Sequence, residues 1–217
     1  MKIAEVKKTK LKSAYPELEE ISAVLVNHNS RLQIDTINWA DYTYKPQVEL
    51  SIEYSDNEIF LKYYIVENYF KAEMTEPNQN VFEDSCVEFF VSPDEDGIYY
   101  NLEINGIGTC LLGSGTGRAN STRANPEIIS KIRRLSSVGK KPVKEKEGKF
   151  SWTITIAIPF AVFFHHKIKE LKGKAFKANF YKCGDKLAIP HYVTWNPVGT
   201  AMPDFHQPIY FGILKFI

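Results

Sequence analysis

The sequence predicts an all-β fold, a two-sheet antiparallel β-sandwich of jelly-roll type with short peripheral helices. Many short segments alternate apolar and polar residues with a period of two, which is the pattern of half-buried strands. Turn residues separate these segments, and few segments have a helical pattern. At 217 residues with 44% hydrophobic content, the chain can bury the core of one such domain.

The clearest pattern is a hairpin with strands at 86–92 and 98–104, joined by a turn at 92–97. Each strand places apolar residues on one face and mostly polar residues on the other. The polar face carries carboxylates, amides and tyrosine, which suits either a surface that grips hydroxyl-rich ligands or an ordinary solvated face. A one-residue slip in register would exchange the two faces.

Further segments follow the same alternation. Strands are predicted at Val48–Tyr54, Glu58–Val66, Thr109–Leu112, Phe150–Pro159, Ala175–Lys182 and Ile209–Phe216. If these strands share a sheet with the hairpin, one face collects Glu88, Asn101, Glu103, Thr155, Lys177, Asn179 and Tyr181. A short helix is predicted over 16–25, where proline opens the segment and acids fill its first turn, and another over 126–135.

The chain shows no internal repeat and no linker that would divide it. We expect residues 1–33 to form an N-terminal segment that packs on the domain, and residues 34–217 to form the sandwich. The long excursion at about 113–149 is rich in glycine and basic residues, and excursions of this length are often functional.

Composition limits the partners. The 27 basic residues nearly balance the 26 acidic ones, so no basic excess suggests nucleic acid or an anionic membrane. No apolar run reaches the roughly 18 residues of a membrane span, and no apolar signal segment is visible at the N-terminus. The three cysteines, Cys86, Cys110 and Cys183, lie in apolar strand segments, which predicts buried free thiols and favours a cytoplasmic location.

Other chemistries receive little support. The histidines lack cysteine partners or a ligand spacing for zinc. The acidic turn Asp94–Gly97 cannot alone supply the six to eight oxygens that calcium needs, although Glu83 and Asp84 add carboxylates. Glu88 and Glu103 could face each other as a glycosidase pair requires. The glycine run at 113–117 lacks the Lys-Ser/Thr that completes a phosphate loop.

Six short motifs occur in an order that resembles the family 9 carbohydrate-binding modules, and more closely the stand-alone family-9-like proteins of Bacteroidetes. Each motif is weak alone, but their order is fairly specific, and the resemblance covers about residues 34–217. The motifs are Ile34-Asp35 with Asn38-Trp39, Phe82 to Phe90, Tyr99 to Thr109, Trp152 to Phe160, Trp195-Asn-Pro197 and Tyr210 to Phe216.

The resemblance implies a non-catalytic β-sandwich that binds the ends of oligo- or polysaccharides. In the family, two tryptophans sandwich a sugar ring and polar side chains bind its hydroxyls. Trp195 matches the second tryptophan, whereas Phe82 stands where the first would be and offers a smaller face without an N–H donor. Glu88 matches the motif glutamate, and the other polar candidates are Asn101, Arg118 and Asn179.

The family also allows a structural calcium ion, and no other cofactor is expected. An alternative stays open, in which the chain is a protein-interaction or scaffold domain that has lost sugar binding, since sandwich folds host many functions. The burial of Phe82 and Trp195 discriminates between the two hypotheses, because a stacking platform must be accessible. The sugar hypothesis predicts that Phe82 and Trp195 flank an open cleft.

Overall fold

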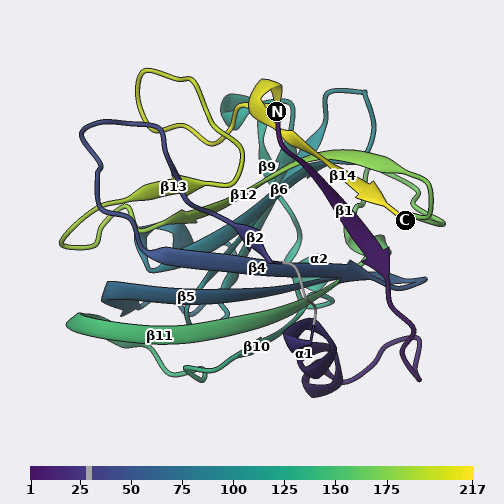
Figure 1. Cartoon of the computed structure of the whole chain (residues 1–217), viewed down its shortest axis with the longest axis horizontal. Coiled ribbons are helices and arrows are strands. Elements are labelled where there is room, and N and C mark those ends of the chain that lie inside the picture. Colours follow the sequence, from purple (N-terminus) through teal and green to yellow (C-terminus); the bar gives the residue numbers. More distant parts are fainter. Residues whose placement is uncertain (28–30) are drawn as a thin grey trace.

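The computed structural model describes residues 1–27 and 31–217 and has two β-sheets packed face to face, as Figure 1 shows. The first sheet has the strand order β14 (Gly212–Phe216), β12 (Ala175–Cys183), β6 (Cys86–Ser92), β7 (Tyr99–Asn105), β8 (Cys110–Gly115) and β9 (Thr122–Arg123). The second sheet has the order β10 (Arg133–Ser136), β11 (Val143–Pro159), β5 (Glu58–Ala72) and β4 (Gln47–Tyr54). The predicted sandwich is therefore confirmed.

The N-terminal residues form part of both sheets. Strand β1 (Ile3–Lys8) runs parallel to β14 in the first sheet and then parallel to the end of β4 in the second. The sequence predicts an N-terminal segment that packs on the domain and an antiparallel sandwich, so the parallel pairing of this strand departs from the prediction. Short strands complete the edges: β2 (Leu32–Gln33) pairs with β4, and β13 (Tyr192–Thr194) joins β12 to β3 (Thr36–Ile37).

Helices are short and peripheral. Helix α1 (Leu18–Val26) confirms the first predicted helix and buries Ile21 and Leu25 against the second sheet. Helix α2 (Pro126–Ile129) is shorter than predicted, because residues 133–136 instead pair with β11 as β10. Single turns occur at η1 (Val81–Glu83), η2 (Arg118–Asn120), η3 (Phe160–Val162) and η4 (Pro208–Tyr210). None of the described helices is long and apolar enough to span a membrane.

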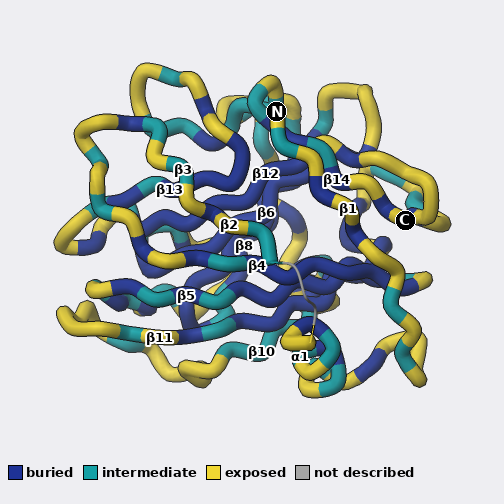
Figure 2. Tube along the Cα trace, in the orientation of Figure 1, coloured by how far each residue is buried: buried dark blue, intermediate teal, exposed yellow. Residues whose placement is uncertain are grey.

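Two strands are longer than their alternation predicts. Strand β5 continues to Ala72, and β11 begins at Val143, with two irregularities in register between them. The first half of β11 is mostly polar and exposed, as the yellow part of its tube shows in Figure 2. It therefore lacks the alternation of apolar and polar residues from which a strand is predicted.

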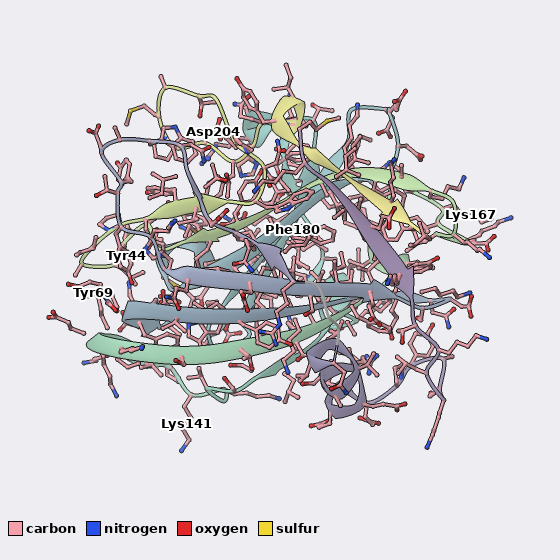
Figure 3. The ribbon with its side chains drawn as sticks, in the orientation of Figure 1. Tyr44, Tyr69, Lys141, Lys167, Phe180 and Asp204 are labelled. Carbon is pink, nitrogen blue, oxygen red and sulfur yellow. The ribbon has the colours of Figure 1, made fainter. Side chains whose placement is uncertain are left out.

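The main core fills the space between the sheets. From the hairpin it takes Val87, Phe89 and Val91 of β6 and the apolar residues of β7, as the alternation predicts. Figure 3 places Phe180 of β12 between the two layers. Its ring lies 5.6 Å from that of Trp195, centroid to centroid, and 5.0 Å from that of Phe89.

The opposite face of the first sheet is covered as well. A second apolar cluster lies there and combines sheet residues with residues from the loops at 39–42, 74–82 and 198–211; its buried members include Trp39, Phe90, Tyr99, Tyr181, Phe205 and Phe211. The ring of Phe205 stacks on that of Tyr181 at 4.1 Å. These loops form a layer that covers the polar residues of this face and separates most of them from solvent.

The predicted polar face is only partly assembled. Glu88, Asn101, Glu103, Asn179 and Tyr181 share the outer face of the first sheet. Thr155 does not, because β11 belongs to the second sheet, where Thr155 pairs with Lys62.

Candidate functional site

A small pocket opens in the loop layer over the first sheet. Its volume is about 110 Å³, which corresponds to roughly four water molecules at ~30 Å³ each. Aromatic and charged side chains share its wall: Phe82, Glu88, Glu103, Arg118, Asp185, Tyr192, Pro203, Phe205 and His206.

Strand register sets the pocket floor. Glu88 on β6 lies directly opposite Glu103 on β7 and, on its other side, opposite Tyr181 on β12. The two carboxyl groups therefore project from neighbouring strands on the same face, since directly opposed residues share a side of the sheet.

Short segments around this floor supply the walls. Phe82 comes from η1, Arg118 from η2, Tyr192 from β13, and Asp185 from the loop that follows β12. The backbone N–H of Asp185 donates to the carbonyl of Phe82 at 2.9 Å, which fixes these two pocket segments to each other. Phe82 and Tyr192 are half-buried, so their rings are accessible in part.

The pKa values of the three carboxyl groups that line the pocket are raised. Burial raises the pKa of Glu103 to about 7, although a hydrogen bond from Asn101 opposes the change. Burial and the neighbouring Glu103 charge hold the pKa of Glu88 well above its ordinary value. Burial also raises the pKa of Asp185 to about 6, against the attraction of Arg118. Removing solvent disfavours the charged form of each acid.

The cationic side chain at the pocket rim is Arg118. It is 65% exposed and its Nη2 lies 2.9 Å from Oδ1 of Asp204, which belongs to the loop seen above β12 in Figure 3. His206 beside it is half-buried, and its Nδ1 lies 2.7 Å from the hydroxyl of Tyr99. Burial and the Arg118 charge lower the pKa of His206 to about 4, so this ring is neutral at pH 7.

Two of the buried thiols lie under the pocket. Ligand atoms of Cys86, Glu88 and Cys183 lie within 4.8 Å of one another, which is the proximity that a metal ion requires. The thiol of Cys183 donates instead to Oε1 of Glu88 at 3.1 Å, and burial raises the pKa of both thiols. Protonated thiols are poor ligands, so we interpret this cluster as a hydrogen-bonded group. All three cysteines are free and buried, as predicted.

In the acidic turn at Asp94–Gly97, which we considered for calcium, the carboxylate of Asp96 contacts protein groups. Oδ2 of Asp96 lies 3.2 Å from Nε2 of His166, and Oδ1 of Asp96 accepts the backbone N–H of Ile98. A structural calcium ion stays a prediction of the family resemblance.

Three predicted site residues line the pocket, namely Phe82, Glu88 and Arg118. Asn101 lies just outside the lining and donates from Nδ2 to Oε1 of Glu103 at 2.9 Å. It therefore positions a pocket acid.

Trp195 and Asn179 are placed otherwise than predicted. Trp195 is 3% exposed and packs in the main core, so it cannot serve as a stacking platform. The prediction that Phe82 and Trp195 flank an open cleft is therefore wrong, and at this residue the test favours the alternative of a domain without the family's platform. Asn179 is fully buried and its side chain is bonded to the backbone of Phe180 and Asn196. Both residues contribute to the fold, and neither lines the pocket.

The sequence did not point to five lining residues: Asp185, Tyr192, Pro203, Phe205 and His206. Tyr192 lies three residues before Trp195, and an odd separation along an extended chain puts the two side chains on opposite faces. Placing Trp195 at the site therefore moved Tyr192 away from it. The others come from loops, where no periodic pattern marks which side chains converge.

A larger but shallower groove lies on the outer face of the second sheet. It has a volume of about 890 Å³ and is lined in part by Gln33, Glu49, Tyr64, Ser151 and Thr153. It lacks a cluster of buried titratable groups, since Tyr64 and Glu49 are half-exposed and Glu49 is bonded to Arg31 and Gln33. We therefore take the smaller pocket as the candidate site.

The raised pKa of Glu103 predicts an effect on stability. The folded state binds the Glu103 proton between pH 4.5 and about 7 whereas the unfolded state does not, so stability falls as pH rises through this range. The difference between the pKa of Glu103 in the folded protein and its ordinary value corresponds to about 3 kcal/mol in the free energy of unfolding. Glu103→Gln should therefore flatten the loss of stability between pH 5 and pH 8, measured by urea unfolding. An unchanged pH dependence would show that Glu103 ionises normally.

Comparison with known proteins places the chain in a family. The model of carbohydrate-binding family 9 matches residues 19–216. A solved structure of a proposed carbohydrate-binding protein from Bacteroides uniformis is 40% identical, covers 100% of this chain and 99% of its own, and superposes with a TM-score of 0.96. No curated protein matches this sequence.

More distant structures share the fold. A family 9 carbohydrate-binding module from Caldicellulosiruptor kristjanssonii in complex with glucose has a TM-score of 0.58 at 11% identity, covering 100% of this chain and 96% of its own. The same type of module in complex with cellotriose has a TM-score of 0.58 at 12% identity, covering 99% and 93%. The match of the family model over almost the whole chain shows that this protein belongs to carbohydrate-binding family 9.

Proposed function

We propose that the protein binds the end of an oligo- or polysaccharide without catalysis, with one sugar unit seated in the pocket of Phe82, Glu103 and Arg118. The observation that carries the proposal is the shared lining: half-buried aromatic rings and buried carboxyl groups face one small volume. A sugar ring needs both, since its C–H face is apolar and its rim is formed by hydroxyls. Membership of the family supports the same function.

The size of the pocket favours a chain end. A volume of about 110 Å³ suits one terminal sugar unit better than a run of several units. Glucose and cellotriose, which the Caldicellulosiruptor modules bind, are the first ligands to test.

The proposed binding groups differ in role. The rings of Phe82 and Tyr192 would cover the apolar face of the sugar, and Arg118 and the floor acids would bind hydroxyls. Asn101 would hold Glu103 in place through its hydrogen bond. Burial raises the pKa of both Glu88 and Glu103, and the charge of Glu103 raises that of Glu88 further. We propose that the two carboxyl groups bind hydroxyls, and we assign no hydrolysis to them.

Calorimetric titration with glucose and cellotriose tests the proposal. Arg118→Ala should weaken binding about tenfold, because a hydrogen bond to a charged group contributes about 1.5–3 kcal/mol. Phe82→Leu should weaken it about three- to tenfold through loss of the aromatic face. Both residues are accessible enough for the fold to tolerate the change.

Matched controls lie far from the pocket. Arg31→Ala removes an arginine whose Nη1 likewise lies 2.8 Å from a carboxylate, that of Glu49 on the second sheet. Phe164→Leu removes a phenylalanine that is 39% exposed. The controls should bind as the wild type does. Saturable binding that is equally insensitive to all four substitutions would place the sugar elsewhere.

A further inference from the structure

The pocket has more acid than base. Glu88, Glu103 and Asp185 line it, and the single cation among its lining residues is Arg118. That guanidinium is already within 2.9 Å of a fourth carboxylate, Asp204. Cations near the pocket are also engaged: Nζ of Lys186 lies 3.0 Å from Glu83, and Arg123 donates to the backbone carbonyl of Asn78 and to the side chain of Asn80.

One oxygen of the acid cluster lacks a partner. Glu103 is 4% exposed, its Oε1 accepts a hydrogen bond from Asn101, and its buried Oε2 has no hydrogen-bond partner within the described part of the chain. A buried acceptor left unpaired is costly. Since Glu103 lines the pocket, a ligand in the pocket can supply a donor.

We propose that the preferred ligand of this pocket is an amino sugar with a free, protonated amine, and that Glu103 accepts a hydrogen bond from its ammonium group. The inference rests on the proposed sugar binding and names the class of sugar. Asp185, which lines the same pocket, supplies further negative charge, and Glu88 adds carboxyl oxygens as hydrogen-bond acceptors.

An ammonium group would pair the free oxygen of Glu103 and balance the excess of acids in the pocket. It brings three N–H donors, one of which satisfies Oε2 of Glu103, and it brings the positive charge that the floor lacks. Its attraction to carboxylates is stronger in a partly buried site than in water. The rings of Phe82 and Tyr192 in the pocket wall add an attraction for cations. A neutral hydroxyl offers one donor and no charge.

The charge state of the floor gives the inference a pH signature. The groups that surround Glu103 are Glu88, Asp185, Arg118, Arg123, Asn101, Cys86 and Tyr99. Cys110 also interacts with its charge, from the core-facing side of the sheet. Because the pKa of Glu103 is raised to about 7 and that of Asp185 to about 6, both acids are largely protonated at pH 5. An ammonium ligand therefore binds more tightly at pH 7 than at pH 5 and displaces protons when it binds.

Calorimetry with glucosamine, glucose and N-acetylglucosamine tests the inference. These three sugars share one ring and differ at one substituent, as amine, hydroxyl and neutral amide. At pH 7 glucosamine should bind at least tenfold more tightly than either of the others, and at pH 5 the preference should fall below threefold. Glu103→Gln should abolish the preference at pH 7, whereas Glu49→Gln, a carboxylate bonded to Arg31 on the second sheet, should keep it.

The outcomes separate the two proposals. If glucose binds as tightly as glucosamine, the amine inference is wrong and the proposed sugar binding stands. If the preference survives in Glu103→Gln, the assignment to Glu103 is wrong. If none of the three sugars nor cellotriose binds at millimolar concentration, the proposed function itself fails, and the amine inference fails with it.

Discussion

Lys182→Met is expected to destabilise the fold by about 3–5 kcal/mol, because it leaves a buried carboxylate without its counter-ion. Lys182 on β12 and Glu67 on β5 are both fully buried, and Nζ lies 2.9 Å from Oε2. The ammonium also donates to the carbonyl of Cys183, and Nε2 of His191 lies 2.8 Å away. Oε1 of Glu67 accepts the indole N–H of Trp152 at 2.7 Å. This cluster joins the first sheet to the second.

Urea unfolding at pH 7 measures the effect. The matched control is the double variant Lys182→Met with Glu67→Gln, which removes both charges and keeps an acceptor for Trp152. The double variant should recover most of the lost stability, since replacing a buried ion pair as a whole is far less costly than breaking it. A loss below about 1 kcal/mol in the single variant would contradict the buried pair.

Trp195→Ala is expected to cost about 3–5 kcal/mol of stability, the range for removing a large aromatic side chain from a core. Trp195 packs against Phe180, and a Cβ added at Gly212 would lie 2.5 Å from its ring, so the space around it is filled. Thermal or urea unfolding measures the loss. Trp195→Phe should cost much less, because it keeps most of the apolar volume.

The same variant separates a core residue from a platform. At a temperature where Trp195→Ala is folded, its sugar affinity should stay within about threefold of the wild type, because the ring does not line the pocket. A variant of normal stability that no longer binds sugar would show that Trp195 contacts the ligand after all.

Alternation in the sequence was sufficient to predict the sandwich. The strands at Cys86–Ser92 and Tyr99–Asn105 have one apolar and one mainly polar face, and the apolar face lies in the main core. The strand at the N-terminus escaped prediction because Ile3–Lys8 is short, charged and paired in parallel on both sides. The segment at 133–136 was assigned to a helix because its pairing with β11 is a tertiary effect.

The site was predictable only where the alternation, the family resemblance or the long loop pointed to a residue. Glu88 follows from the alternation, and Phe82 and Arg118 follow from the resemblance and from the loop that carries the arginine. The prediction for Trp195 was wrong because the alternation of β13 continues to this residue. Val193 and Trp195 pack in the main core, whereas Tyr192 lies in the loop layer. The enclosure of the floor by residues 203–206 depends on long-range packing, which no local pattern encodes.

A titration followed residue by residue tests the central claim most directly. Amide resonances of the uniformly ¹⁵N-labelled protein would be recorded while glucosamine and then cellotriose are added. We predict saturable shifts at Arg118, Asp185 and Tyr192 around the pocket, with no change at the groove of Gln33, Tyr64 and Thr153. Shifts confined to that groove, or none at either place at millimolar sugar, would contradict the account.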